Sequence, residues 1–286
     1  MTLLQRLPLL LILAAAANAA IAPAQEVSLP GNSDSVKFAV IGDSGTGTAS
    51  QYAVGRQMAD ARAPFPFEFV IMLGDNMYGS QRPSDFIQKF ERPYASLLQA
   101  GVKFYASLGN HDNQDNRFYK PFSMGGERYY TFTRKNVRFF ALDTNLLDPT
   151  QLAWLDDQLK ESREDWKVCF FHHPLYSHAG RHGGNVPLRV ALEPLFLKHG
   201  VDVVFSGHDH VYERVKPQKG ITYFVSGAAG QLRSGDMRPS AATAASFDAD
   251  QTFMLVDVDR DDMRFQAKTR TGAVVDSGTI RRRPRE

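Results

Sequence analysis

The chain alternates between short apolar runs and amphipathic stretches, and this alternation predicts most of its secondary structure. Runs of Val, Ile and aromatic residues that end at glycine or polar residues predict strands, and longer stretches with helically spaced apolar positions predict helices. The predicted strands are residues 36–41, 67–73, 102–108, 128–133, 137–142, 166–171, 201–206, 221–226, 252–257, 263–269 and 273–280, and the predicted helices are 50–61, 84–99 in two pieces broken at Pro93, 149–161 and 187–198.

The order of these elements favours a layered α/β domain. Strands and helices alternate early and strands dominate later, which argues for stacked sheets flanked by helices. No internal repeat or charged linker divides the chain, so residues 36–280 are predicted to form one domain. Asp148 before Pro149 predicts a capped helix start. Residues 227–247 are rich in Gly, Ala and Ser and predict a long loop.

The first residues have the pattern of a secretory signal peptide. Arg6 precedes an apolar run, 7–17, which small-residue cleavage options follow. This run has about half of the ~20 residues that a spanning helix needs, so an uncleaved membrane anchor is the weaker alternative. We expect a signal peptide at 1–24, a polar leader at 25–35, and an exported protein, periplasmic or secreted, with no membrane contact after cleavage.

Composition narrows the classes of partner and compartment. The formal net charge of +2 is close to balance, so we expect no nucleic acid as a stable partner. The single cysteine, Cys169, excludes an intrachain disulfide, and the chain has no glycosylation sequon. With the Ala-rich signal, these features favour a bacterial periplasm. We expect a monomer, with a solvated basic tail at 281–286.

Polar clusters follow five of the predicted strands directly. Because ligand sites in open α/β sheets lie beyond the carboxyl ends of strands, we expect these clusters to meet in one place. In four of the five clusters, a glycine before the Asp, Asn or His permits a sharp turn and close approach of the main chain. The clusters are Gly42-Asp43-Ser44-Gly45, Gly74-Asp75-Asn76-Met77-Tyr78, Gly109-Asn110-His111-Asp112, His172-His173-Pro174 and Gly207-His208-Asp209-His210.

The side chains in these clusters are typical of a metal site. Carboxylate, amide, phenol and imidazole donors together suit zinc, iron or manganese. Seven of the eight histidines lie in or beside the clusters, and only His199 lies on a predicted helix. A lone Gly-Asp after a strand is usually a turn, and Gly-His-x-His is more specific because alternate residues of an extended segment share a face. It is the five clusters together, in this order, that indicate a metal centre.

These motifs resemble the metallophosphoesterase signature and, more narrowly, that of the purple acid phosphatases. Gly45 stands where general metallophosphoesterases carry a histidine, and Tyr78 is present where they place no tyrosine ligand. The resemblance covers residues 37–224 and is to the small, single-domain, tartrate-resistant type. Cys169 replaces a valine that is frequent in the fourth motif, and we expect no functional effect from this change.

The resemblance implies a fold and a cofactor. The expected fold is an α/β sandwich of four layers, with two stacked mixed β-sheets flanked by helices. The expected cofactor is a dinuclear centre of Fe(III) plus Fe(II), Zn or Mn, with Asp75 bridging the two ions. Fe(III) would hold Tyr78 as a coloured phenolate, although a free phenol has a pKa near 10. The implied ligands are Asp43, Asp75, Tyr78 and His210 for the first ion, and Asp75, Asn110, His172 and His208 for the second.

The resemblance also implies hydrolysis of phosphate monoesters by attack of a metal-bound hydroxide, on phosphorylated small molecules or phosphoproteins. His182 is the expected general acid, and His111 is expected to contact the phosphate or assist protonation. His178 is a weaker candidate acid. His173 is not expected to ligate, because neighbouring residues of an extended segment point opposite ways. Two acidic residues, Asp112 and Asp209, are expected to orient histidines.

One other function remains open, and two are disfavoured. A phosphodiesterase or nucleotidase on the same dimetal scaffold is the nearest alternative, since loops such as 183–190 and 227–247 would set substrate choice. A non-catalytic metal-binding or scaffold protein would be expected to lack a ligand, and all seven positions are filled. A nucleotide binder is disfavoured, because the glycine-rich segment 42–47 lacks the Lys-Ser/Thr of a P-loop and does not fit the Rossmann fingerprint.

Overall fold

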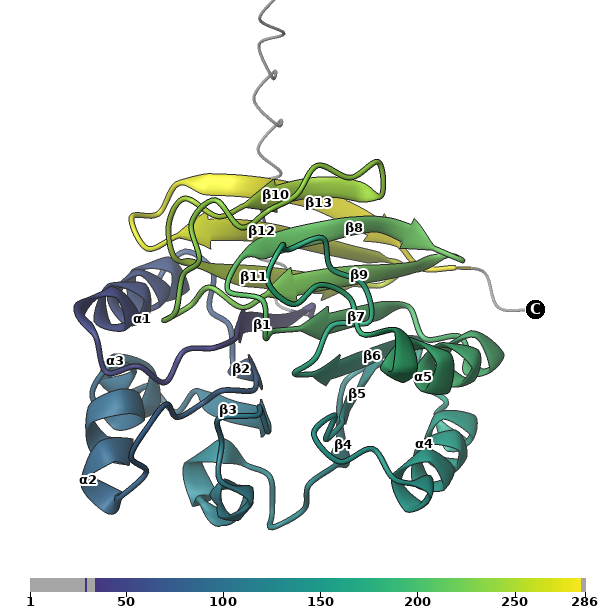
Figure 1. The fold of residues 1–286 in the computed structure, drawn as a ribbon, viewed down its shortest axis with the longest axis horizontal. Helices are drawn as coiled ribbons and strands as arrows, with labels where there is room; N and C mark the ends of the chain where they lie inside the picture. Colours follow the sequence, from purple (N-terminus) through teal and green to yellow (C-terminus); the bar gives the residue numbers. More distant parts are fainter. Residues whose placement is uncertain (1–28, 30–33, 284–286) are drawn as a thin grey trace, which may run out of the picture.

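The computed structural model describes residue 29 and residues 34–283, and in it two β-sheets stack face to face between two groups of helices (Figure 1). The predicted signal peptide and most of the predicted leader lie outside the described residues. Among the described residues, no helix combines the length and the apolar character needed to cross a bilayer.

The first sheet has six strands, in the order β13-β12-β11-β1-β2-β3. Its β1, β2 and β3 are parallel, and β11 joins the other side of β1 in the antiparallel sense. The carboxyl ends of these three parallel strands therefore meet at one edge of the sheet. The strands are β1 Val36–Ile41, β2 Phe69–Leu73, β3 Lys103–Ser107, β11 Thr252–Asp259, β12 Asp262–Thr269 and β13 Val274–Arg281.

The second sheet has seven strands, in the order β10-β8-β9-β7-β6-β5-β4. Its central strands β5, β6, β7 and β9 are parallel, and β4, β8 and β10 are antiparallel to their neighbours. The strands are β4 Tyr130–Arg134, β5 Val137–Ala141, β6 Trp166–Phe171, β7 Val203–Ser206, β8 Tyr212–Gln218, β9 Ile221–Ser226 and β10 Thr243–Phe247.

Helices cover the outer face of each sheet, α1, α2 and α3 on one side and α4 and α5 on the other (Figure 1). The helix α4 begins at Pro149 with Asp148 as its N-cap, as predicted, and Asp148 accepts a hydrogen bond from the Gln151 main-chain nitrogen. The helices are α1 Ala49–Arg62, α2 Pro83–Phe86, a π-helical turn Ile87–Glu91, α3 Ala95–Gln99, 3-10 turns Gln114–Phe118 and Lys120–Phe122, α4 Pro149–Glu161 and α5 Val186–His199.

Three apolar layers hold these elements together, one between the sheets and one beneath each group of helices. Between the sheets, the Phe38 ring stacks on Phe69 at 5.3 Å between centroids and meets Phe139 edge-on at 5.2 Å. Each buried phenylalanine contributes about 1.5–3 kcal/mol relative to an exposed one. The expected four-layer α/β sandwich is therefore the observed fold.

The sequence pattern missed two strands of the second sheet. The strand β8 was not predicted because it carries charged residues and Pro217. In the fold, two of these charged side chains have partners: Glu213 lies beside His178, and Arg214 donates to Asp276. The strand β10 lies within 227–247, so the prediction of a continuous loop was wrong there. It is a half-exposed edge strand of small residues, with little apolar signal.

The C-terminal residues are more ordered than the predicted tail. Arg281 is the last residue of β13, and the side chain of Arg282 forms an ion pair with Asp261 at 2.6 Å. The Arg283 guanidinium donates to the carbonyl oxygen of Val201. The last three residues, 284–286, lie outside the described residues.

Candidate metal centre

The five polar clusters meet at the edge where the carboxyl ends of the parallel strands of both sheets lie. Within each sheet, main-chain hydrogen bonds join neighbouring loops, from Asp43 N to Gly74 O at 3.0 Å and from Gly207 N to His172 O at 2.9 Å. Between the sheets, the His208 main-chain nitrogen donates to Asp43 Oδ2 at 2.8 Å. The two sheets thus bring loops distant in sequence into direct contact.

The first group of donors contains Asp43, Tyr78 and His210. The Tyr78 hydroxyl lies 3.1 Å from Asp43 Oδ1 and 3.2 Å from His210 Nε2, and His210 Nε2 lies 3.4 Å from Asp43 Oδ1. Asp75 offers a carboxylate oxygen within 4.8 Å of those of Asp43 and His210. All four residues predicted for the first ion therefore lie together.

The second group contains Asn110, His172 and His208. Asn110 Oδ1 lies 2.9 Å from His172 Nε2 and 3.1 Å from His208 Nδ1, and these two ring nitrogens are 3.1 Å apart. Asp75 Oδ1 lies 3.5 Å from His172 Nε2, so Asp75 borders both groups. This is the position that a bridging carboxylate requires, although ligation itself stays a prediction.

The hydrogen bonding of His172 shows that this second group fits a cation. His172 Nδ1 lies 2.9 Å from the carbonyl oxygen of Leu73, which only accepts, so Nδ1 carries the ring proton. In the neutral ring Nε2 is then a lone pair, and it points at another acceptor, the amide oxygen of Asn110. His208 Nδ1 lies 3.1 Å from both of these atoms, and a cation bound by all three would satisfy the lone pairs that converge there.

The pKa values of these side chains indicate that the site lacks positive charge. Burial, then the charge of Asp75, raises the pKa of Asp43 well above its usual value. Burial lowers the pKa of His208 to about 2 and that of His210 to about 4. Burial and the carboxylates of Asp43 and Asp75 raise the pKa of Tyr78, so its phenol stays protonated unless a strong cation binds.

Three of the donor residues have strained main chains. Asp43, Asp75 and His208 have φ angles of 54°, 49° and 69°, in the left-handed region that non-glycine residues seldom adopt. Such strain costs on the order of 1–3 kcal/mol per residue and collects at functional sites. The fold therefore holds these side chains at this edge against a local preference.

Gly45, which stands where general metallophosphoesterases carry a histidine, packs directly against the loop that carries Tyr78. A Cβ atom at Gly45 would overlap the main-chain carbonyl of Asn76. The same two loops are joined by a hydrogen bond from Tyr78 N to Gly45 O at 2.9 Å. No side chain fits at Gly45, and the loop contact that excludes it positions Tyr78 beside Asp43.

The two predicted catalytic histidines lie over opposite parts of the centre. The ring of His111 lies 4.7 Å from that of Tyr78, and its main-chain nitrogen donates to Asp75 Oδ1 at 2.8 Å. The ring of His182 lies 4.3 Å from that of His208 and is exposed. Both side chains can therefore reach a phosphate group held between the two donor groups.

The structure corrects the predicted roles of Asp112 and Asp209, because neither orients a histidine. Asp112 accepts main-chain hydrogen bonds from Asn76 at 3.1 Å, Met77 at 2.9 Å and Gly109 at 2.9 Å, and so ties two ligand-bearing loops together. Asp209 accepts from the Ser177 hydroxyl at 2.5 Å. The carboxylates shape the loops, and the Leu73 carbonyl is the group that orients His172.

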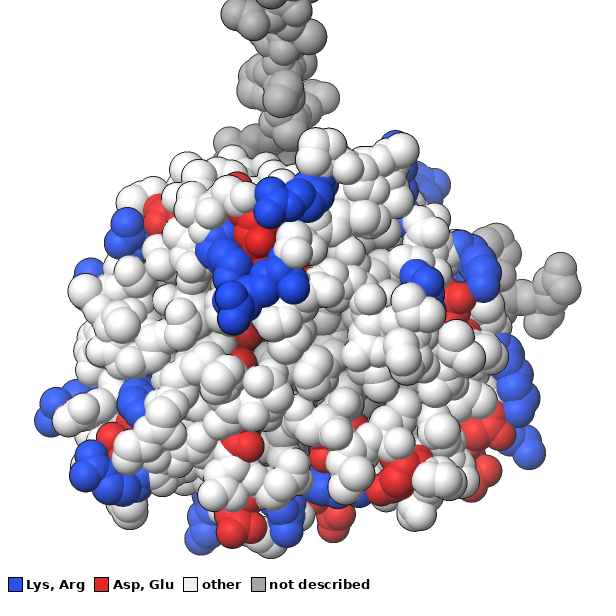
Figure 2. Space-filling view, viewed as in Figure 1, with Lys and Arg blue, Asp and Glu red and all other residues white. Residues whose placement is uncertain are grey.

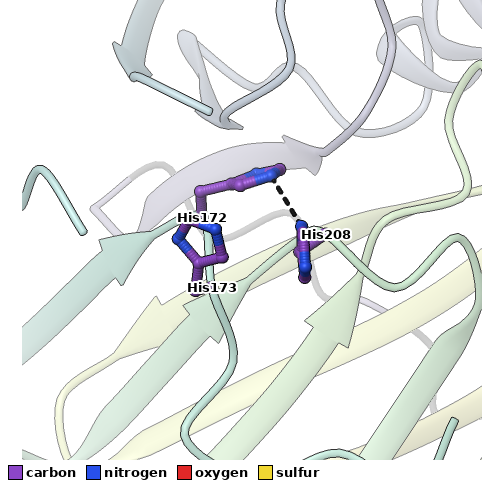
Figure 3. A group of neighbouring side chains, drawn as sticks. All are labelled: His172, His173 and His208. Atoms are coloured by element: carbon purple, nitrogen blue, oxygen red, sulfur yellow. Dashed lines mark hydrogen bonds between the residues drawn. The ribbon is translucent and has the colours of Figure 1, made fainter. Parts of the chain in front are cut away.

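His178 and His173 lie in different places relative to the centre. His178 is held outside the two donor groups, since its Nδ1 lies 2.6 Å from the buried carboxylate of Glu213. His173 lies beside the centre, with its ring 4.5 Å from that of His208 (Figure 3). It forms a cation-sized group of donors with His172 and His208. The adjacent pair of histidines was the only sequence signal for this placement.

An open groove runs along the outer side of the second donor group. One cavity of about 540 Å³ is lined by Asn110, and another of about 550 Å³ is lined by His182 and His208. Both include His173, Asn185 and Pro187 in their walls, so they adjoin. The sequence did not point to Asn185 as a residue of this groove, because an Asn before a helix is typical of an N-cap, and Asn185 is the N-cap of α5.

Comparison with known proteins identifies the family. Residues 36–212 match the model of the calcineurin-like phosphoesterases. The chain belongs to the calcineurin-like phosphoesterase family. Tartrate-resistant acid phosphatase type 5 of Oryctolagus cuniculus is 30% identical over 242 residues, which cover 69% of this chain and 74% of that protein. Purple acid phosphatase 17 of Arabidopsis thaliana is 28% identical over 248 residues, 73% of each chain.

Solved structures share the fold of this phosphoesterase. GAP50 of Plasmodium, described as the anchor in the inner membrane complex, has a TM-score of 0.79 at 17% identity and covers 88% of this chain and 90% of its own. The purple acid phosphatase PPD1 of yellow lupin has a TM-score of 0.70 at 20% identity, covering 88% of this chain and 55% of its own. The chain is thus a purple acid phosphatase-like hydrolase of the phosphoesterase superfamily, and a dinuclear metal centre is expected for its family.

Proposed function

We propose that this phosphoesterase is an acid phosphatase of the purple type, which hydrolyses phosphate monoesters of small molecules or phosphoproteins. The observation that carries the proposal is the pair of donor groups that share Asp75, with Tyr78 in only one of them. The unequal donor sets favour two different ions, Fe(III) at the tyrosine and Fe(II), Zn or Mn at the histidines.

A bound metal pair supplies a water nucleophile at neutral pH and neutralises charge on the phosphate. Asp43, Tyr78 and His210 would hold one ion, Asn110, His172 and His208 the other, and Asp75 both. Because the Leu73 carbonyl fixes the ring proton of His172 on Nδ1, its Nε2 is ready to bind without a change of tautomer.

In this proposal, His182 donates a proton and His111 binds the phosphate group. His182, exposed in the groove, would give its proton to the oxygen of the leaving alcohol as the ester bond breaks. Burial, then the charges of Arg233 and Arg181, lowers the pKa of His182, which favours giving up that proton. His111, on the Tyr78 side, would hold the phosphate oxygens and keep the phosphorus between the ions.

The fold by itself does not decide between catalysis and a scaffold role, since one of its neighbours is described as an anchor. The complete donor set favours catalysis. Export to the periplasm or outside the cell is also proposed, on the pattern of the first 24 residues. A monomeric state is proposed as well.

The test is a comparison of 4-nitrophenyl phosphate with bis(4-nitrophenyl) phosphate, on purified protein whose metal content is measured by elemental analysis. Faster turnover of the monoester with two metal ions per chain supports the proposal. Preference for the diester would make the chain a phosphodiesterase, and active protein without metal would exclude both.

The tyrosinate assignment has a separate test in the visible spectrum. Tyr78→Phe should abolish the charge-transfer band of iron-loaded protein. Tyr52→Phe, at a half-buried tyrosine of α1 whose hydroxyl donates to the Gln88 carbonyl at 3.0 Å, is the matched control and should keep it. A band that survives Tyr78→Phe would reject the assignment.

A further inference from the structure

His173 lies where the two adjoining cavities of the groove meet the second donor group. It lines both cavities, so a molecule in the groove can reach it. Its ring lies 4.5 Å from that of His208 and 4.9 Å from that of His172, and the three rings surround one small space (Figure 3). Neither the predicted ligand sets nor the proposed reaction gives His173 a role.

Thr144 determines which nitrogen of His173 carries the ring proton. Thr144 is buried, and its Oγ1 accepts a hydrogen bond from the His173 main-chain nitrogen at 3.1 Å and lies 3.0 Å from His173 Nδ1. Among the described residues, Nδ1 is the only acceptor that the Thr144 hydroxyl proton reaches. The hydroxyl therefore donates to Nδ1, and a neutral His173 carries its own proton on Nε2.

The two adjacent histidines are thus in opposite tautomers. In His172 the Leu73 carbonyl holds the proton on Nδ1 and leaves Nε2 as a lone pair, which suits a metal ion. In His173 the lone pair of Nδ1 is used by Thr144, and Nε2 carries a proton. On distance alone His173 could join His172 and His208 around a cation, but it has no free lone pair to give. Its free group is an N–H, which suits an anion.

The groove offers few other charged groups to an anion. Asp112 and Arg181 are the only Asp, Glu, Lys or Arg residues, within the described part of the chain, that line the two cavities. Across the visible face, Lys and Arg side chains also gather in separate groups with broad uncharged areas between them (Figure 2). His173 Nε2 has no hydrogen-bond partner among residues 34–283, so its proton is available to a molecule in the groove.

The simplest structural role for His173 would be to join the loop after β6 to the loop after β5. The main chain already makes this connection, through the hydrogen bond from His173 N to Thr144 Oγ1. The ring is not needed for it. The ring instead places an N–H donor, with its tautomer fixed, at the wall of an open groove beside the predicted ligands.

We propose that His173 is a substrate-binding residue, which donates a hydrogen bond from Nε2 to an oxygen of the phosphate group at the second donor group. Thr144 is its positioning residue, because the hydroxyl holds the ring in the donor tautomer. The proposal rests on the proposed phosphatase function and adds a phosphate contact on the groove side, opposite His111 on the Tyr78 side.

Imidazole NMR of zinc-loaded protein, which is diamagnetic, tests the tautomer without any measurement of activity. Long-range correlation of ring protons with ring nitrogens should show a protonated Nδ1 in His172 and a protonated Nε2 in His173. Thr144→Val should allow both tautomers of His173, whereas Thr144→Ser keeps the hydroxyl and should keep one. An unprotonated Nε2 in His173 of the parent protein would overturn the proposal.

Calorimetric titration of metal-loaded protein with inorganic phosphate tests the contact itself. His173→Phe keeps a ring but removes the donor, and should weaken phosphate binding about tenfold or more with unchanged metal content. It should raise KM for 4-nitrophenyl phosphate more than it lowers kcat, because the oxygen is bound before and during reaction. His173→Gln, whose amide can donate, should recover part of the affinity. His199→Gln, at the amino ends of the strands, is the matched control and should bind phosphate as the parent does.

The possible outcomes separate this proposal from the phosphatase function. Loss of a metal ion in His173→Phe, by elemental analysis, would make His173 a ligand and overturn the proposal. Unchanged phosphate affinity in His173→Phe with its full metal content would also overturn it and leave the phosphatase intact. If the metal-loaded parent hydrolyses no phosphate ester, the proposed function fails, and the titration with inorganic phosphate still decides whether His173 binds the anion.

Discussion

The two ends of the central parallel strands carry cavities of different character. At the amino ends of β6 and β7, a cavity of about 690 Å³ is larger than either cavity beside the metal centre. Two of its ammonium groups have close partners: Lys198 lies 2.8 Å from Asp156, and the Lys167 ammonium donates to the His199 carbonyl at 2.7 Å. At the carboxyl ends, the oxygen and nitrogen atoms of the predicted metal ligands converge. Converging ligand atoms therefore mark the functional end, and cavity size does not.

The largest expected effect comes from removing the carboxylate that borders both donor groups. Asp75→Ala should lower kcat/KM by at least about a thousandfold, because both ions lose a ligand. Elemental analysis should show the loss of at least one metal ion per chain. Lys198→Met, in the larger cavity, should leave activity unchanged and alter the free energy of unfolding by about 1 kcal/mol or less.

Asp75→Ala should also leave the metal-free protein no less stable than the parent. Asp75 is a buried carboxylate whose charge raises the pKa of Asp43, so its replacement relieves charge repulsion with Asp43. A metal-free variant that unfolds far more readily in urea would mean that Asp75 has a structural role, and the contrast between the two ends would weaken.

The next effect concerns the proton donor in the groove. His182→Ala should slow an alkyl phosphate, a poor leaving group, by about a hundredfold or more, and 4-nitrophenyl phosphate far less. His178→Gln is the matched control, since His178 is held by Glu213. Equal slowing of both esters by His182→Ala, or leaving-group dependence in His178→Gln, would move the acid role away from His182.

The sequence was sufficient to predict that these seven side chains lie together, because each one lies directly after, or within a few residues of, a buried strand. Metal binding by them stays a prediction. It was not sufficient for the roles of Asp112 and Asp209, since these depend on which main-chain amides converge after folding. The polar strand β8 was missed because its charged residues find their partners only after folding, as Arg214 does with Asp276.

A smaller effect is expected where the loops of Asp43 and Tyr78 touch. Gly45→Ala should force the Asn76 carbonyl aside and lower kcat/KM tenfold to about a hundredfold, since sub-ångström shifts of ligands are costly. It should destabilise the fold by about 1–3 kcal/mol. Gly101→Ala, at a φ of 77° with open space around it, should cost about 1–2 kcal/mol without loss of activity. Similar activity for both variants would show that the loop contact is not part of the site.

The smallest expected effect is the pH dependence of the metal-free fold. The pKa of His210 falls from about 6.5 in the unfolded chain to about 4 in the folded one. Between these values only the unfolded chain takes the proton, so the free energy of unfolding should fall as pH falls through this window, by up to about 3 kcal/mol for a difference of 2.5 units. Asp112 and Asp209, with pKa values raised by burial to about 7 and about 6, act in the opposite direction.

The contribution of His210 is isolated by the difference between parent and His210→Gln in urea unfolding at pH 4.5, 5.5 and 6.5. The variant should lose less stability on acidification than the parent does. Identical slopes for parent and His210→Gln would mean that His210 does not cause the loss of stability on acidification, which would contradict the prediction.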